Sequence, residues 1–177
     1  AAAQNLPEVD IVPVASAASR QASRCVLSVI TAIAEVIEEH AAELGRIDAV
    51  AGDGDHGIGM VRGSLGALEK AREMQQRQAG AGTLLCRAAD AWADQAGGTS
   101  GALWGVLLTA IGTALGDETS PDARRVALGV RHAKEGIMHF GKAKPGDKTM
   151  VDVLVPFSDR LTERVAAGDT PVSYTHL

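Results

Sequence analysis

Apolar residues recur every three or four positions along most of this chain, and this spacing constrains the fold more than any other feature of the sequence. In the first such segment they lie on one side of a helix: Val26, Val29, Ile30, Ile33, Val36 and Ile37. A period near 3.6 residues predicts an amphipathic helix whose apolar side is turned towards a core. Strand-like character competes only at residues 47–51, a short segment that contains Asp48.

The same spacing predicts six helices in all. Their expected spans are 16–44, 60–77, 83–96, 100–115, 120–141 and 148–167. Gly45, Gly97 and Gly141 provide helix ends, and Ser120 with Pro121 provides a helix start. The segment 100–115 is apolar on nearly all sides, which predicts a central position for that helix.

The composition favours helices as well. Apolar residues make up 46% of the chain but aromatic residues only 3%, a balance typical of closely packed helices rather than strands. We therefore expect an all-α fold, an antiparallel helical barrel or bundle. Further core positions predicted by the helical period are Leu65, Leu68, Leu84, Leu85, Trp92, Val130, Ile137, Val153, Leu154 and Phe157. Cys25 and Cys86 fall inside helical patterns and are expected to be small buried side chains.

Three segments are expected along the chain. Residues 1–15 contain Pro7 and Pro13 and predict a linker or tail, 16–167 predict one helical domain, and 168–177 predict an irregular tail of non-native appearance. A net charge of −5 and few aromatic residues argue against nucleic-acid binding. Because no signal peptide is recognised and the longest apolar stretch, 102–115, is short for a bilayer, we expect a cytoplasmic chain without a membrane span.

The loop between the first two helices carries the strongest chemical signal. Asp48, Asp53 and Asp55 fall within eight residues there. Each like-charge pair at 4 Å costs ~1 kcal/mol in water and ~4 kcal/mol at an effective dielectric constant of 20. A bound divalent cation reverses the sign of that energy, and carboxylate oxygens without a nearby thiolate favour magnesium. The loop therefore predicts a magnesium site that bridges to nucleotide phosphates.

Two other motifs match parts of this loop and are rejected. Gly52, Gly54 and Gly57 have the spacing of a dinucleotide-binding fingerprint, but that motif needs a preceding strand, and helices flank the loop here. A calcium-binding EF-hand fails because Gly57 occupies a ligand position and no glutamate closes the loop. The simplest alternative is an ordinary turn, in which Asp-Gly pairs shape the backbone and Asp55 caps the next helix.

Two further glycine-rich segments could contact phosphates. Residues 97–101 open a helix, where backbone N–H groups and the hydroxyls of Thr99 and Ser100 can bind anions; the alternative is an ordinary serine cap. Residues 141–150 resemble a P-loop, but they hold one residue too many and no strand precedes them. The lysines of this segment either face phosphates or are solvated surface residues.

Together, the segments 48–57, 97–101 and 141–153 resemble the nucleotide-binding L domain of dihydroxyacetone kinases, in the family's order and over residues 20–165. The resemblance implies a barrel of antiparallel helices with ATP or ADP at one end. It implies that Asp48, Asp53 and Asp55 hold two Mg²⁺ ions on the phosphates. The nucleotide contacts that it implies are His56, Gly57, Ile58, Gly59, Thr99, Ser100, Gly141 and Met150. Gly59 departs from the polar residue that relatives often carry at this position.

The resemblance also implies partners. In this family a histidine on a separate K domain binds dihydroxyacetone covalently, so the chain is expected to be the phosphoryl-donor part of a kinase that needs a K domain or subunit and forms a homodimer. Related kinases act on other short ketoses such as erythrulose. The family continues with more C-terminal helices, so we expect one wall of the barrel to be missing. Two alternatives stay open: a phosphotransferase-dependent L subunit that carries ADP, and a non-catalytic helical module that binds a partner.

Overall fold

Six α-helices and no strand make up residues 11–168, the residues that the computed structural model describes. The helices are α1 (Ala17–Asp48), α2 (His56–Gln76), α3 (Ala81–Ala96), α4 (Gly98–Leu115), α5 (Ala123–Gly141) and α6 (Val151–Ala166). The predicted all-α fold is confirmed. The predicted tails lie largely in 1–10 and 169–177, outside the described residues.

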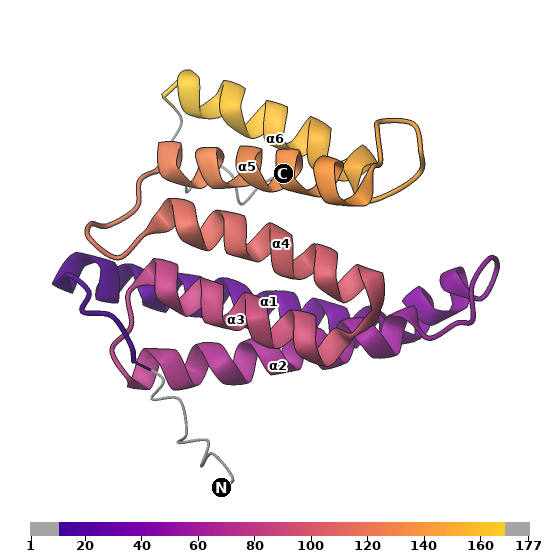
Figure 1. The fold of residues 1–177 in the computed structure, drawn as a ribbon, viewed down its shortest axis with the longest axis horizontal. Coiled ribbons are helices and arrows are strands. Elements are labelled where there is room, and N and C mark those ends of the chain that lie inside the picture. The colour runs from indigo at the N-terminus through magenta and orange to yellow at the C-terminus, as the bar shows by residue number, and fades with distance from the viewer. Residues whose placement is uncertain (1–10, 169–177) are drawn as a thin grey trace, which may run out of the picture.

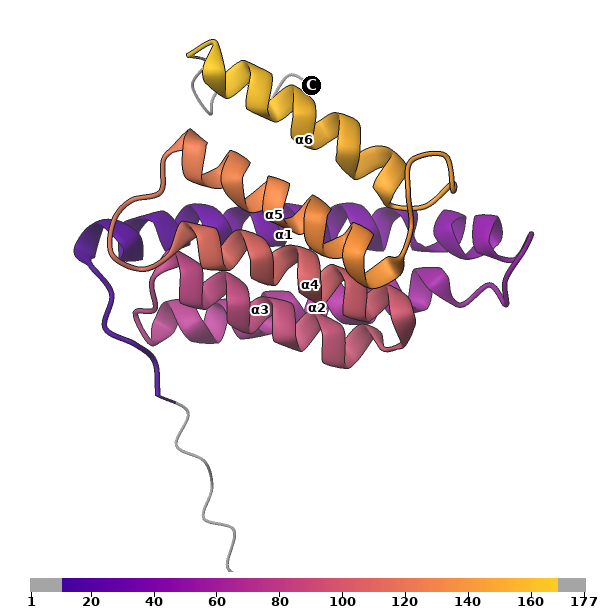
Figure 2. The ribbon, with the colours of Figure 1, turned by 45° about the horizontal axis from the view of Figure 1, so that its top comes forward.

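Consecutive helices pack side by side and run in alternating directions (Figure 1). α1 also packs on α3, so α1 to α4 form one body, and α5 and α6 extend it on the side of α4 (Figure 2). Because the helices alternate, the turns that follow α1, α3 and α5 all lie at one end of the molecule. These turns contain the three segments that the sequence analysis singles out.

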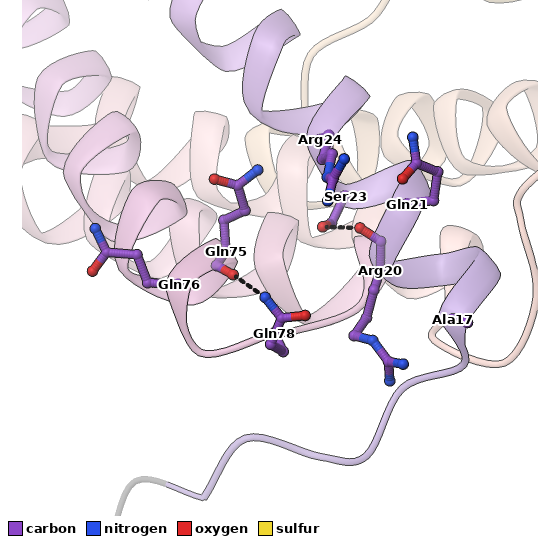
Figure 3. A pocket seen from close by; sticks show the side chains of 8 residues that line it. All are labelled: Ala17, Arg20, Gln21, Ser23, Arg24, Gln75, Gln76 and Gln78. Atoms are coloured by element: carbon purple, nitrogen blue, oxygen red, sulfur yellow. Dashed lines mark hydrogen bonds between the residues drawn. The ribbon is translucent and has the colours of Figure 1, made fainter.

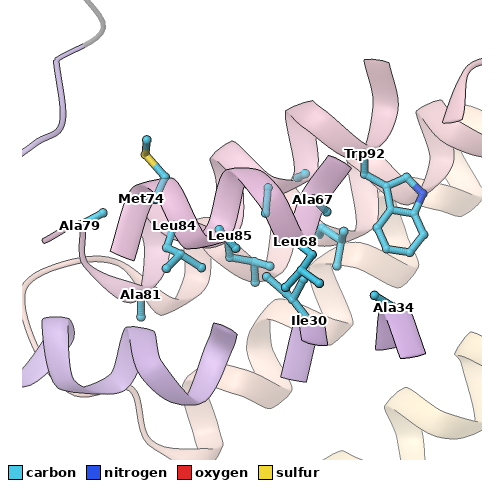
Figure 4. Close-up of a cluster of buried hydrophobic side chains, with 14 of the residues drawn as sticks. Ile30, Ala34, Ala67, Leu68, Met74, Ala79, Ala81, Leu84, Leu85 and Trp92 are labelled. Atoms are coloured by element: carbon cyan, nitrogen blue, oxygen red, sulfur yellow. The ribbon is translucent and has the colours of Figure 1, made fainter. Parts of the chain in front are cut away.

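The main core lies between α1, α2, α3 and α4 and is built from small side chains around a few large ones (Figure 4). Ala67, Ala71 and Ala88 have no exposed surface, while Leu84 and Trp92 fill the wider spaces. Small residues let helix axes approach closely, which explains how a core forms with so few aromatic residues. A second cluster joins α5 and α6 and consists of Val130, Ile137, Val151 and Leu154.

Some helix ends differ from the sequence-based prediction. α1 continues past Gly45 to Asp48. Gly45 does not end the helix but allows a close approach to the next turn, since a Cβ at Gly45 would lie 2.9 Å from the carbonyl oxygen of Gly54. α5 begins at Ala123 rather than at residue 120, since the carboxylate of Asp122 accepts the N–H of Arg125 at 2.9 Å and caps the helix.

The helical period correctly predicts most core positions, but several of the predicted side chains are exposed within residues 11–168. In α1, Ile30 and Ile37 are buried, whereas Val29 and Val36 are 58% and 55% exposed. Leu65, Val153 and Phe157 are also exposed. An apolar groove of about 680 Å³ runs along α1, lined by residues that include Val29, Val36, Ile47, Met60 and Trp104. The period identifies an apolar helix face, but it does not show whether another helix covers that face.

The two cysteines differ from the expectation as well. Cys25 is exposed, Cys86 is partly buried, and both thiols are free. Burial raises the pKa of the Cys86 thiol, which keeps it in the less reactive protonated form.

α4 occupies the predicted place between α3 and α5. It has 18 residues and a mean hydropathy of 1.3, so by length and composition it could cross a membrane, contrary to the sequence-based estimate. Core helices of soluble proteins pass the same test, and two helices flank this one.

Side chains from distant parts of the chain hold the start of α3. The hydroxyl of Ser19, in α1, accepts the N–H of Ala81 at 2.9 Å. The carboxylate of Asp117, after α4, accepts the N–H of Thr83 at 3.1 Å and the Thr83 hydroxyl at 2.5 Å. N–H groups in the first turn of a helix have no partner within the helix, so these acceptors replace a local cap. They join α1, α3 and α4 at the end opposite the three turns.

We expect Asp117→Ala to lower the free energy of unfolding by ~1–2 kcal/mol, because it removes the cap of α3. Urea unfolding followed by circular dichroism measures the change. Glu118→Ala, at the exposed neighbouring position, is the control and should stay within ~0.5 kcal/mol of the parent. Equal stabilities of the two variants would contradict a capping role for Asp117.

Candidate metal and nucleotide site

The three predicted aspartates come together at the turn between α1 and α2. Asp48 ends α1, Asp53 lies in the turn, and Asp55 immediately precedes α2. One carboxylate oxygen from each lies within 4.8 Å of the others. Asp48 is half-buried, whereas Asp53 and Asp55 are exposed. An all-oxygen set of this kind suits a hard divalent cation such as Mg²⁺.

Hydrogen bonds fix the backbone of this turn. Oδ2 of Asp48 accepts the N–H of Gly54 at 2.9 Å, and Oδ1 of Asp53 accepts the N–H of Asp55 at 3.3 Å. Gly54 has a φ of +81°, a conformation that other residues rarely adopt. Asp55 occupies the cap position of α2, but its side chain makes no capping hydrogen bond. The ordinary-turn alternative therefore does not explain Asp55, because the carboxylate of this residue does not cap α2.

The charges of the trio oppose one another. The pKa of Asp55 is raised above its usual range, first by a hydrogen bond with the Asp53 carboxyl and by the charge of Asp53, then by burial and by Asp48; the neighbouring His56 lowers it. A cation placed between the three carboxylates would remove this repulsion and favour their ionised forms. The electrostatics of the turn thus fit a metal-binding role.

A very close contact between α1 and α2 positions the turn. A Cβ on Gly57 would lie 2.1 Å from the carbonyl oxygen of Ala41 and 3.2 Å from the nitrogen of Gly45. Gly57 is consequently buried, while His56 and Gly59 are partly exposed and Ile58 is 57% exposed. A cavity of about 580 Å³ lies against this contact, and Gly54 and Ile58 are among the residues that line it.

The second predicted segment opens α4 at the same end of the molecule. Gly97 and Gly98 have positive φ values of 66° and 62°, and a Cβ on either would meet no atom within 4 Å. Gly97 is the cap, so Thr99 and Ser100 lie in the first helical turn, and Ser100 is not the cap itself. The N–H groups of this turn and the helix dipole favour an anion.

Contacts between helix ends bring the first two segments into one region. A Cβ on Gly59, in the first turn of α2, would lie 3.4 Å from the carbonyl oxygen of Ala96, at the end of α3. The start of α2 therefore lies beside the turn that leads into α4. α6 also begins at this end, so the positive ends of three helix dipoles share it.

The third segment connects α5 to α6. Gly141 is exposed at the end of α5, and a Cβ on it would lie 3.8 Å from a methyl group of Leu103 in α4. Met150 directly precedes α6 and packs on the second core cluster. No strand precedes the segment among residues 11–168, which agrees with the rejection of a P-loop.

Asp152 is a residue of this segment that the sequence analysis did not single out. Its carboxylate accepts the N–H groups of Gly146 at 2.6 Å and Thr149 at 2.9 Å, and these bonds lower the pKa of Asp152. The sequence contains a signal for this arrangement, since Thr149 and Asp152 have the spacing of a capping box.

A polar pocket of about 440 Å³ lies at the opposite end of α1 and α2 (Figure 3). Arg20 and Arg24 line it from α1, and Gln75 and Gln76 at the end of α2 line it together with Gln78 in the following turn. It is separate from the three predicted segments. The guanidinium of Arg20 donates to the carbonyl oxygen of Ala15, which directs it along the chain before α1.

Comparisons with known proteins find similar sequences in named kinases and in an ADP-binding kinase subunit. The sequence model described as the DAK2 domain matches residues 50–175. The chain is 65% identical over 161 residues to the L-erythrulose kinase of Pectobacterium atrosepticum, covering 91% of this chain and 27% of that enzyme. It is 33% identical to the ADP-binding subunit DhaL of the PEP-dependent dihydroxyacetone kinase 1 of Listeria innocua, covering 76% of this chain and 67% of that subunit. The chain thus spans about a quarter of the length of the erythrulose kinase.

Solved structures share the fold. The dihydroxyacetone kinase of C. freundii in its native form has a TM-score of 0.59 and 22% sequence identity, and the match covers 96% of this chain and 28% of that one. The same enzyme in complex with AMP-PNP and Mg²⁺ has a TM-score of 0.53. At this identity the likeness establishes the helical fold alone.

The close contact between α1 and α2 leads to a stability prediction. Gly57→Ala should lower the free energy of unfolding by ~1–3 kcal/mol, because the new methyl group overlaps the backbone of Ala41. Gly59→Ala is the matched control: its Cβ meets only an ordinary contact, and alanine favours the helix by up to ~1 kcal/mol. Urea unfolding of both variants measures the difference, and a Gly57→Ala chain as stable as the parent would disprove the contact.

Proposed function

The chain belongs to the DAK2 domain family, and we propose that it is the magnesium- and nucleotide-binding part of a kinase, the part that donates a phosphoryl group to a short ketose. The observation that carries this proposal is the acidic trio of Asp48, Asp53 and Asp55, gathered at the end of the molecule where three helices begin. The names of the relatives, which are kinases and an ADP-binding subunit, support it.

Within this proposal the three aspartates hold Mg²⁺ on the nucleotide phosphates, and the family resemblance suggests two ions. Bound magnesium supplies charge neutralisation between carboxylate and phosphate oxygens, which is the main requirement of phosphoryl transfer. Asp48 orients the turn through its bond to Gly54 and keeps its other oxygen available. Asp53 and Asp55 are exposed, so they can accept a cation that arrives with its nucleotide.

The proposed nucleotide contacts lie around the trio. His56, Gly57, Ile58 and Gly59 form the first turn of α2, and Thr99 and Ser100 lie in the first turn of α4. The unsatisfied N–H groups of these turns favour phosphate oxygens of ATP or ADP. Because Gly57 is buried against α1, we infer that it acts through its backbone and through packing. Gly141 and Met150 are proposed to line the nucleotide from the third segment.

The degree of identity favours one form of kinase. The chain is 65% identical to the erythrulose kinase, of which it covers 27%, but only 33% identical to the ADP-binding subunit. We therefore propose a domain of a larger ATP-using kinase, with an erythrulose-like ketose as substrate. The ketose would be bound by a K domain or subunit, and the full kinase would be a cytoplasmic homodimer. The separate subunit that carries ADP is the second candidate, supported by the match over 67% of the DhaL chain.

The exposed groove along α1 supports the prediction that more helices complete the bundle. Val29 and Val36 are more than half exposed there, and Trp104 forms part of the lining. Exposed apolar surface of this extent is unfavourable in water. A kinase that includes this domain would bury the groove under further helices, so nucleotide affinity should be measured in a chain extended at its C-terminus as well.

Asp53→Asn should weaken MgADP binding by at least about tenfold, since it removes a metal ligand. The same substitution removes one of three like charges, so the stability of the metal-free chain should stay equal or rise. Isothermal titration calorimetry with MgADP, paired with thermal unfolding, measures both effects. Glu118→Gln, with the same change of charge at the opposite end, is the control.

Two outcomes would count against the proposal. An Asp53→Asn chain that binds MgADP as tightly as the parent would exclude the metal assignment. A parent chain, extended at its C-terminus, that binds no MgADP but forms a complex with a K subunit would instead favour the non-catalytic module.

A further inference from the structure

The loop between α5 and α6 has an unusual backbone. Lys142, Gly146 and Lys148 have φ values of 51°, 98° and 56°, all in the left-handed region. Glycine adopts this region readily, but a lysine does so only when its surroundings hold it there. The loop therefore needs interactions that compensate for two unfavourable backbone conformations.

Asp152 supplies two interactions around Lys148. Its Oδ1 accepts the N–H of Gly146 at 2.6 Å, and its Oδ2 accepts the N–H of Thr149 at 2.9 Å, so both carboxylate oxygens are used and Lys148 lies between the two donors in sequence. The hydroxyl of Thr149 accepts the N–H of Val151, the first residue of α6, at 3.2 Å. The Asp147 carboxylate accepts one bond in the first half of the loop, from the N–H of Lys144 at 3.0 Å, and the backbone N–H of Asp147 donates to the Lys144 carbonyl at 3.1 Å.

The loop lies at the end of the molecule that contains the acidic trio, and Gly141 and Met150 flank it. The side chains of Lys142, Lys144 and Lys148 are exposed. Within residues 11–168 the structure records no ion pair for these three ammonium groups. Asp152 thus binds the backbone of a positively charged loop at the same end of the molecule as the region proposed for a polyanion.

We propose that Asp152 is a positioning residue of the nucleotide site, which holds the 142–150 loop in the conformation that nucleotide binding requires. The inference rests on the proposed function. Asp152 contacts the loop backbone rather than the nucleotide, so its effect on binding passes through Gly146 and Thr149.

Electrostatics and positioning predict opposite signs for the effect of neutralising Asp152. Removing a negative charge near bound phosphates strengthens binding if charge alone matters. Asparagine, however, has a single acceptor oxygen, and its NH2 group would face one of the two N–H donors. Asp152→Asn therefore breaks one bond and places two donors together, so a positioning role predicts weaker binding.

The test compares MgADP affinities by calorimetry for the parent, Asp152→Asn, Asp152→Glu and Asp147→Asn. We expect Asp152→Asn to weaken binding by about tenfold, the effect of one lost charge-assisted hydrogen bond. Asp152→Glu keeps both oxygens and should recover most of the affinity. Asp147→Asn makes the same charge change in the same loop and should bind as tightly as the parent or more tightly. Amide hydrogen exchange at Gly146 and Thr149 should accelerate in Asp152→Asn.

The outcomes separate this inference from the function on which it rests. If the parent chain binds MgADP and the Asp152→Asn variant binds it equally or more tightly, the inference fails while the proposed function stands. Equal losses in Asp152→Asn and Asp147→Asn would also overturn it, because the effect would then not be specific to Asp152. If the parent binds no MgADP, the proposed function fails, and a role of Asp152 in nucleotide binding fails with it.

Discussion

The contact between Gly57 and the backbone of Ala41 is the constraint on which the candidate site depends. With no side chain between them, α1 and α2 lie close enough for Asp48 at the end of one helix and Asp55 at the start of the other to meet across a short turn. A methyl group at Gly57 would push the helices apart at the point where the carboxylates converge. The alternation of helix directions then adds the starts of α4 and α6 to the same end, so three helix dipoles and three carboxylates create a region that suits a cation together with a polyanion.

Much of this arrangement could be predicted from local sequence. The helical period identified all six helices and core residues such as Leu84 and Trp92, because a 3.6-residue repeat of apolar side chains has few other solutions. The three aspartates were predicted to converge, and the structure places them within reach of one cation. Their assignment as metal ligands stays a prediction, since the relatives support a nucleotide-binding kinase domain without testing individual residues.

Features that depend on distant partners could not be predicted in this way. Gly45 was expected to end α1, but its role is a close approach to Gly54, which only the packing of two helices creates. Val29 and Val36 lie on the apolar side of α1, yet no described helix covers them. Ser19 and Asp117 cap N–H groups of α3 that are 62 and 34 residues away in sequence, and no local pattern predicts such a bond. Asp152 is different, because the spacing of Thr149 and Asp152 is a local capping-box pattern that predicts their bond.

The central claim is that metal and nucleotide bind together at the end where the three turns meet. Nuclear magnetic resonance with Mn²⁺-ADP tests it most directly, since the paramagnetic ion broadens the signals of nearby amides. We expect broadening at Gly54, His56 and Thr99, from the first and second turns, and none at Arg20 or Gln75 in the polar pocket at the other end. Broadening centred on Arg20 and Gln75, or an equal effect of Mn²⁺-ADP on an Asp53→Asn chain, would contradict the account.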